Sequence, residues 1–322
     1  MKKNHTAIHY IEAFRMGQAF QTIFRVIKYM EGFFRKEYQY MNLFQGALLG
    51  LLQGLGEFLP VSSSGHLLLA RLIMGLQDQT SSYKVFDIML HVGTLIPLIV
   101  LFRKEWMEMI LHPVKNKTLM NLVVASIPTF LIYLAAKKLI VINDLEGFDL
   151  FDSGWFLGVS FLITAFFLLL CDVSSSRRSV PGKKVGPFQA VMMGLFQGIG
   201  MIPGISRSGS TILGGLVSGL DKKKAASFSF MMSAPAILGS LVMEGKDLLK
   251  ADASVSIDVL PTLVGVIVAA VSGFLALRFM LKMITRVPLC RFAVYVALLG
   301  IIFLIFQLAG SSLFPAFSVP SA

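Results

Sequence analysis

Long apolar stretches recur along the chain, and they constrain its fold more than any other feature. They lie at 85–103, 119–136, 154–172, 225–243, 259–280 and 292–309. Each is close to the roughly 20 residues that an α-helix needs to cross the hydrocarbon core of a bilayer. Only 15% of the residues are charged, whereas soluble domains carry about 25%. The sequence therefore predicts an all-α polytopic membrane protein.

The formal net charge of +11 does not indicate a nucleic-acid partner. Lys and Arg lie in short loops between the apolar runs, which is where membrane topology places them. No basic surface with interleaved aromatic residues is evident. Cys171 and Cys290 are far apart and have no metal-binding or disulfide-framework spacing, so we expect free thiols.

Residues 1–40 form a separate, basic N-terminal leader. Ile and Phe recur in it at helical spacing, with Arg and Lys between them. This pattern predicts an amphipathic helix that lies on a membrane surface. A non-essential leader that precedes a start at Met41 is the alternative, and the purpose of the segment stays open.

The chain contains an internal repeat. GLLQGLGEFLPVSSSGHLLL, residues 50–69, aligns without a gap with GLFQGIGMIPGISRSGSTIL, residues 194–213. The identical positions are Gln53/Gln197, Gly54/Gly198, Gly56/Gly200, Ser62/Ser206, Ser64/Ser208 and Gly65/Gly209. FDIML from Phe86 similarly resembles FSFMM from Phe228. Fixed-period similarity of this kind predicts a duplicated architecture.

Each half consists of one broken polar segment followed by three of the apolar spans. We expect a first repeat at 41–172 with a re-entrant segment at 43–76, a second at 187–309 with a re-entrant segment at 187–220, and a C-terminal tail at 310–322. Lys and Arg cluster after the first and third spans of the first half and after the second span of the other. The positive-inside rule places these loops in the cytoplasm.

Basic residues also flank 187–220, so this segment enters and leaves on the cytoplasmic side, and 43–76 does so outside. This inverted topology predicts a site near the membrane interior between the halves, although it places the basic leader outside.

Both broken segments have the pattern of a helix that stops and restarts. Pro60 and Pro203 end a helix, and a serine-rich stretch opens the next one in each case. Free backbone N–H groups at a helix start, together with the helix dipole, attract anions and phosphate above all.

Glu57 and Arg207 are ionisable residues inside otherwise apolar segments. Glu57 stands four residues after Gln53, so both face one side of the first half-helix. A charge at this depth indicates function, with a buried structural pair as the alternative. A guanidinium needs a counter-anion and suits phosphate oxygens bidentately.

Hydroxyls and an imidazole surround these two charges in sequence. Ser62, Ser63 and Ser64 are either substrate ligands or ordinary N-caps. His66 lies one turn beyond Ser63 and is a candidate base or nucleophile, or it bonds a carbonyl. On the second segment the corresponding hydroxyls are those of Ser206, Ser208 and Thr211, which we expect to converge with Arg207 on one phosphate.

Asp87 and His91 also stand four residues apart, on the first full span. A structural and a functional role are both open for this pair.

Together these groups suit an anionic phosphate that is carried by a lipid. Mg²⁺ or Ca²⁺ would bridge Glu57, with Gln53, to phosphate oxygens, because hard cations prefer oxygen ligands. Phosphoryl transfer needs mainly neutralisation of charge and in-line positioning.

The motifs resemble those of the undecaprenyl-diphosphate phosphatases, the bacitracin-resistance family. Gln53 to Glu57 is similar to the family's (E/Q)xxxE motif, and PGISRSGST from Pro203 is similar to its PGxSRSxxT motif. EFLPVSSSGH completes the match, and the resemblance covers about residues 42 to 309. It implies hydrolysis of undecaprenyl diphosphate to recycle the carrier lipid of wall synthesis. The expected location is the bacterial inner membrane, with the site open to its outer side.

The resemblance also assigns roles to the candidate residues. Glu57, Ser63, His66 and Arg207 would be catalytic; Ser62, Ser64, Ser206, Ser208 and Thr211 would bind substrate; Glu57 and Gln53 would hold the metal. Gln53 in the first motif position removes one charge from the metal site. The attacking group is Ser63 activated by His66, His66 itself, or water.

Two further interpretations remain. A polyprenyl-phosphate flippase shares the inverted-repeat architecture and would use Arg207 to bind a headgroup. A structural scaffold leaves the buried Glu57 and Arg207 unexplained. A homodimer is kept open.

Overall fold

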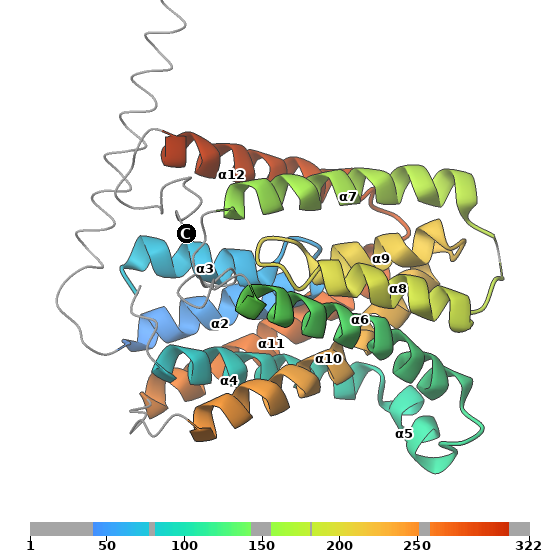
Figure 1. Cartoon of the computed structure of the whole chain (residues 1–322), viewed down its shortest axis with the longest axis horizontal. Helices are drawn as coiled ribbons and strands as arrows, with labels where there is room; N and C mark the ends of the chain where they lie inside the picture. The colour runs from blue at the N-terminus through green and yellow to red at the C-terminus, as the bar shows by residue number, and fades with distance from the viewer. Residues whose placement is uncertain (1–40, 77–80, 143–155, 181, 251–257, 309–322) are drawn as a thin grey trace, which may run out of the picture.

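A computed structural model describes residues 41–76, 81–142, 156–180, 182–250 and 258–308 (Figure 1). All the regular secondary structure in these ranges is helical. The leader 1–40 and the tail 310–322 lie outside the described residues.

The first half of the chain contains six described helices. They are α2 (Leu43–Phe58), α3 (Ser63–Met74), α4 (Ser81–Leu101), α5 (Arg103–Leu111), α6 (Lys117–Ile142) and α7 (Leu157–Arg178). The second half contains five: α8 (Pro187–Ile199), α9 (Arg207–Val217), α10 (Lys222–Lys250), α11 (Val259–Met283) and α12 (Cys290–Leu308).

The prediction of an all-α membrane protein is confirmed. Within the described residues, five helices are long and apolar enough to cross a membrane, or six if the bent pair α4–α5 counts as one span. The four helices α2, α3, α8 and α9 have only 16, 12, 13 and 11 residues. At 1.5 Å per residue, even α2 reaches only about 24 Å, which is less than the roughly 30 Å of a hydrocarbon core. The inverted orientation of the two halves stays a prediction.

Helix α5 was not expected from the sequence. The chain bends by 82° after α4 and continues as a short helix. Arg103, Lys104, Glu105 and Glu108 follow one another there, while Met109 is buried. A helix with this many charges cannot continue into hydrocarbon, so the polar stretch turns aside, with Met109 buried and Trp106 packed on the core.

Each broken segment packs on the other half of the chain. Helix α2 lies along α11, and α8 lies along α6, while α7 and α12, the last spans of the two halves, pack against each other. Figure 1 shows α2, α3, α8 and α9 in the middle of the molecule, between the α7–α12 pair and helices α4 and α10. The two short-helix pairs therefore meet in the interior.

Aligned glycines permit this cross-packing. A Cβ atom added to Gly50 would lie 2.3 Å from the carbonyl oxygen of Gly265 on α11, and one added to Gly194 would lie 2.1 Å from that of Ala125 on α6. Gly50 and Gly194 occupy the same position of the repeat. Small residues let membrane helices approach this closely.

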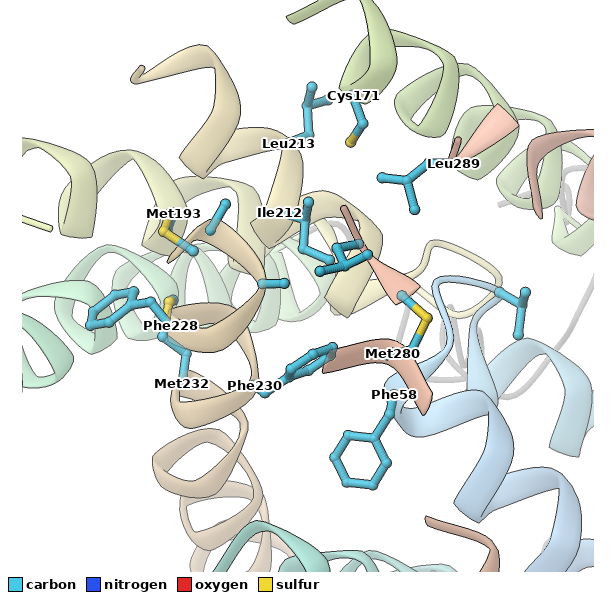
Figure 2. Packing of buried hydrophobic residues seen from close by; sticks show 14 of the residues in the cluster. Phe58, Cys171, Met193, Ile212, Leu213, Phe228, Phe230, Met232, Met280 and Leu289 are labelled. Carbon is cyan, nitrogen blue, oxygen red and sulfur yellow. The ribbon is translucent and has the colours of Figure 1, made fainter. Parts of the chain in front are cut away.

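The apolar core fixes the end of α2. Phe58, the last residue of α2, is fully buried, and its ring meets the ring of Phe230 on α10 edge-on at 6.0 Å between centroids. Figure 2 shows these rings beside Met280 of α11, with Ile212 and Leu213 of α9 in the same cluster. The core thus holds the tip of the first broken segment against the second half. Cys171 and Cys290 are free thiols, as expected.

The packing predicts opposite outcomes for two glycine-to-alanine changes. Gly50→Ala should lower the free energy of unfolding by about 1–3 kcal/mol, because the new methyl group collides with backbone that cannot move aside. Unfolding of the purified protein by SDS in mixed micelles measures the change.

Gly239→Ala is the matched control, because a Cβ atom at Gly239 on α10 meets nothing within 4 Å. It should be neutral or stabilising by up to about 1 kcal/mol, since alanine favours helix over glycine. Equal effects of the two changes would contradict the close approach of α2 and α11.

Candidate active site

The two broken segments are built by the same local rules. Helix α2 ends at Phe58 and α3 begins at Ser63, with Ser62 as its N-cap. The Ser62 hydroxyl accepts a hydrogen bond from the Gly65 amide at 3.3 Å, and the Ser206 hydroxyl accepts one from the Gly209 amide at 3.1 Å at the start of α9. The repeated serines and glycines thus cap both helices.

Glycines also bring the loops into contact. A Cβ atom at Gly56 would lie 2.7 Å from the Cα of Ser63, and one at Gly200 would lie 2.8 Å from the Cα of Arg207. The end of α2 therefore packs tightly against the start of α3, and the turn after α8 packs in the same way against the start of α9. A Cβ atom at Gly65 would lie 2.9 Å from the Cα of Gly204, so the two loops touch each other.

Glu57 and Arg207 form an ion pair that joins the two loops. The guanidinium Nη2 of Arg207 donates to Oε1 of Glu57. Ser63 Oγ donates to Oε2 of the same carboxylate at 3.0 Å, and Gln53 Nε2 donates to it at 3.2 Å. The structure thus brings together four residues that the sequence singled out.

This ion pair is buried at one end and reachable at the other. The side chain of Glu57 is 4% exposed and that of Arg207 is 19% exposed. A buried carboxylate requires a partner and hydrogen bonds to offset its lost hydration, and Glu57 has both. The Arg207 side chain thus keeps some accessible surface, whereas Glu57 has almost none.

Two helix N-termini point at the same place. Ser63 and Arg207, the first residues of α3 and α9, both donate to Glu57. The first residues of two helices therefore converge on one carboxylate through their side chains. An arrangement of two helix starts, a guanidinium and hydroxyls suits an anionic group with several oxygens, such as phosphate.

His66 does not contact Ser63 as the expected activation requires. Its Nδ1 bonds the carbonyl oxygen of Ser62 at 2.7 Å, and its Nε2 bonds the hydroxyl of Tyr295 at 2.8 Å. Both ring nitrogens are thus occupied, and the base next to Ser63 is the carboxylate of Glu57. The prediction that His66 activates Ser63 is therefore corrected. Although the two residues are close in sequence, His66 Nδ1 bonds the Ser62 carbonyl one turn back, and neither ring nitrogen faces the Ser63 hydroxyl.

The first loop also holds strained backbone. Ser62 has φ 72°, which makes it the one non-glycine residue with positive φ among those described. Its hydroxyl lies 3.4 Å from that of Ser64, which is exposed. Strain of this kind costs about 1–3 kcal/mol and concentrates at functional sites.

The hydroxyls of the second loop do not all face the ion pair. Ser208 Oγ donates to the carbonyl of Leu59 across the halves at 3.3 Å, and it lies 3.3 Å from Ser206 Oγ. Thr211 Oγ1 instead donates back to the carbonyl of Arg207 at 2.9 Å and meets Ser229 Oγ of α10 at 2.5 Å. The expected convergence of Thr211 on the phosphate is thus corrected, because its hydroxyl ties α9 to α10.

Asp87 and His91 form contacts of their own. Asp87 pairs with Arg71 of α3 at 2.5 Å, and His91 Nδ1 bonds the backbone carbonyl of Asp87, not its carboxylate, at 2.8 Å. The carboxylate ties α4 to α3, while His91 lies close enough to Glu57 to interact with its charge, so a functional role stays open for this pair.

The donor set near Glu57 suits a hard cation only in part. Gln53 Oε1 is buried and has no hydrogen-bond partner, so it is an available oxygen beside the carboxylate. No group of three or more His, Cys, Asp and Glu side chains suited to a metal occurs in the described residues. The protein therefore offers one carboxylate and one amide oxygen, and a cation would need water and substrate oxygens for the rest.

Three residues at the site were missed in the sequence. Tyr295 of α12 bonds and stacks on His66, Phe161 of α7 meets the same ring edge-on at 5.4 Å, and Thr164 accepts from the Ser206 amide at 2.9 Å. A tyrosine inside an apolar span was the available signal, since its hydroxyl requires a partner.

The chain is similar to known proteins over most of its length. The family model described as "Bacitracin resistance protein BacA" matches residues 46–302. The protein named undecaprenyl-diphosphatase of Carboxydothermus hydrogenoformans is 41% identical over 272 residues, which are 84% of this chain and 99% of that relative. Undecaprenyl-diphosphatase 4 of Bacillus thuringiensis subsp. konkukian is 37% identical over 270 residues, or 83% and 98% of the two chains.

The ion pair predicts strong coupling between Glu57 and Arg207. Glu57→Gln and Arg207→Gln should each lower the free energy of unfolding by about 3 kcal/mol, because each leaves a charge without its partner. The double variant should lose less than the sum, by at least about 1 kcal/mol. SDS unfolding of all four proteins gives the coupling energy.

Arg286 supplies the control cycle, because it is an exposed arginine between α11 and α12. Glu57→Gln and Arg286→Gln should add within about 0.5 kcal/mol. Additivity of the Glu57 and Arg207 variants to the same degree would show that the two loops do not meet.

Proposed function

The chain belongs to the bacitracin resistance protein BacA family, and we propose that it hydrolyses undecaprenyl diphosphate to undecaprenyl phosphate and inorganic phosphate. The observation that supports this most is the Glu57–Arg207 pair, which joins two helix starts inside a membrane protein. The reaction recycles the carrier lipid of peptidoglycan synthesis and underlies bacitracin resistance.

Arg207 binds the diphosphate. Its partly exposed side chain and the N-termini of α3 and α9 supply positive charge and N–H donors to phosphate oxygens. Ser62, Ser64, Ser206 and Ser208 line the two loops and add hydroxyl donors. Thr211 acts indirectly, because it holds the first turn of α9 against α10.

Substrate binding changes the partner of Arg207. In the resting protein, the guanidinium neutralises Glu57. A phosphate that takes over the guanidinium leaves the carboxylate with Ser63 and Gln53. Glu57 is then free to act as a base toward Ser63.

Ser63 is the nucleophile that the geometry favours. Its hydroxyl already donates to Glu57 Oε2 at 3.0 Å, which is the arrangement of an activated nucleophile and its base. Oγ attacks the terminal phosphorus while its proton passes to Glu57, and undecaprenyl phosphate leaves. Water then hydrolyses the phosphoserine and releases inorganic phosphate. Direct attack by water, with Glu57 or His66 as base, gives the same products without the phosphoserine, and attack by His66 would give a phosphohistidine instead.

Glu57 and Gln53 are the residues that would hold Mg²⁺ or Ca²⁺. When bound, the cation would neutralise charge on phosphate oxygens. The available oxygen Gln53 Oε1 supports this assignment. Gln53 also orients the carboxylate through its Nε2 donor.

The protein is a multi-pass membrane protein, and we place it in the bacterial inner membrane with its site open to the outer side. The positive-inside pattern of the loops and the lipid substrate support this location. Both a monomer and a homodimer are compatible with this function.

Arg207→Lys tests the phosphate contact. Lysine keeps the charge but loses the planar pair of donors, so phosphate release from undecaprenyl diphosphate should fall about 100-fold in kcat/KM. The assay uses purified protein in detergent, with Arg286→Lys as the control that should retain wild-type activity.

The same assay separates the phosphatase from a flippase. Wild-type protein in detergent that releases no phosphate, but moves labelled lipid across sealed vesicles, would overturn the proposal.

Removal of divalent cations tests the role of Gln53 and Glu57. EDTA should abolish phosphate release, and Mg²⁺ or Ca²⁺ should restore it. The protein supplies only one carboxylate to the site, so it would hold the cation weakly and lose it to the chelator. Gln53→Glu adds a second carboxylate and should lower the cation concentration that restores half of the activity. Full activity in EDTA would contradict a metal at this site.

A further inference from the structure

We propose that Tyr295 is a positioning residue that fixes the tautomer and the ring orientation of His66. The inference rests on the proposed function, in the alternatives where His66 acts as the base toward water or as the nucleophile. Tyr295 lies on α12, 229 residues from His66, and its hydroxyl lies 2.8 Å from Nε2.

The hydrogen bonds around the imidazole define its protonation. A backbone carbonyl can only accept, so the bond of 2.7 Å between Nδ1 and the Ser62 oxygen places the proton on Nδ1. In neutral His66, Nε2 therefore carries the lone pair. The Tyr295 hydroxyl must then be the donor to Nε2.

Aromatic contacts fix the plane of the same ring. The rings of His66 and Tyr295 are stacked, with centroids 5.7 Å apart and planes 16° apart. Phe161 of α7 approaches His66 edge-on at 73° and 5.4 Å. The imidazole is thus held by a loop carbonyl, by α12 and by α7, and α7 packs along α12.

Comparison of the two repeats shows that the fold does not require the contact between His66 and Tyr295. Ser210 takes the place of His66 in the second loop, and its hydroxyl donates to the Ser206 carbonyl at 2.8 Å, as His66 donates to Ser62. The bond to the N-cap carbonyl therefore belongs to the shared scaffold. The bond from Nε2 to Tyr295 is an addition in the half that also holds Glu57 and Ser63.

Packing alone does not account for the Tyr295 hydroxyl. Its neighbours on α12 are apolar, in the stretch FAVYVALL, and the residue is 49% exposed. A hydroxyl in such a span is costly unless it is hydrogen-bonded, and His66 is its partner.

The contact persists when His66 gains a proton. The Tyr295 oxygen donates to neutral Nε2, and after rotation of the O–H bond it accepts from Nε2–H of the imidazolium. The ring thus keeps one orientation in both protonation states. Loss of the hydroxyl should impair the chemical step more than substrate binding.

Tyr295→Phe tests this role, because it keeps the ring and removes the hydroxyl. In the undecaprenyl diphosphate assay, kcat should fall about 10-fold with KM within about twofold, since one hydrogen bond is lost. Tyr295→Leu, which also loses the stacked ring, should fall further. Tyr133→Phe on α6 removes the same atom elsewhere and should match the wild type.

Nitrogen NMR of protein labelled with ¹⁵N-histidine supplies a readout that does not depend on activity. His66→Gln assigns the His66 signals, which should show a protonated Nδ1 and a hydrogen-bonded Nε2. Tyr295→Phe should shift the Nε2 signal, and Tyr133→Phe should not.

Wild-type kcat in Tyr295→Phe, or an unchanged Nε2 signal, would overturn the role of Tyr295. A wild-type protein that releases no phosphate would overturn the proposed function instead, while the NMR signals would still decide whether Tyr295 holds His66.

Discussion

The ion pair of Glu57 and Arg207 is the interaction on which the rest of the molecule depends. Each charge lies in a segment that is otherwise apolar, and neither is stable there without the other. Their segments are 150 residues apart, so only the fold can bring them together. The cross-packing of α2 on α11 and of α8 on α6, the glycines that permit it, and the capped starts of α3 and α9 all serve to make the two loops meet.

The two halves keep one scaffold but divide the chemistry. The aligned positions hold Glu57 and Met201, Ser63 and Arg207, and His66 and Ser210. The first loop thus supplies acid, hydroxyl and imidazole, while the second supplies the cation. A strictly repeated site would hold two carboxylates or two guanidinium groups, and like charges at low dielectric repel strongly. Because the two halves differ at these three positions, the acid of one half meets the guanidinium of the other, and the pair has no net charge.

Sequence patterns predict the parts of this structure that are local or strongly periodic. The apolar runs predict the spans, and Pro60 and Pro203 predict the breaks between the short helices, since both signals act within a few residues. Spacing also places Gln53 beside Glu57.

The partners of Ser63, His66 and Thr211 could not be predicted in this way. Ser63 bonds Glu57 across the loop, His66 bonds Tyr295 of α12, and Thr211 bonds Ser229 of α10. The contacts of His66 and Thr211 depend on packing between helices, and that of Ser63 depends on the turn between α2 and α3. The bend into α5 depends on where the charged stretch must leave the membrane.

In the proposed reaction, the low dielectric of the site makes the exchange at Arg207 a replacement of one anion by another. A guanidinium buried to this degree is costly without a counter-charge, so it holds either the carboxylate or a phosphate. Glu57 in turn keeps Ser63 and Gln53 as donors when the guanidinium turns to substrate, so its charge is not left without hydrogen bonds. The charge that enters with the phosphate is therefore the event that releases the base. In this proposal the resting carboxylate stays paired with Arg207 until a phosphate arrives, and this couples the availability of the base to the presence of the substrate.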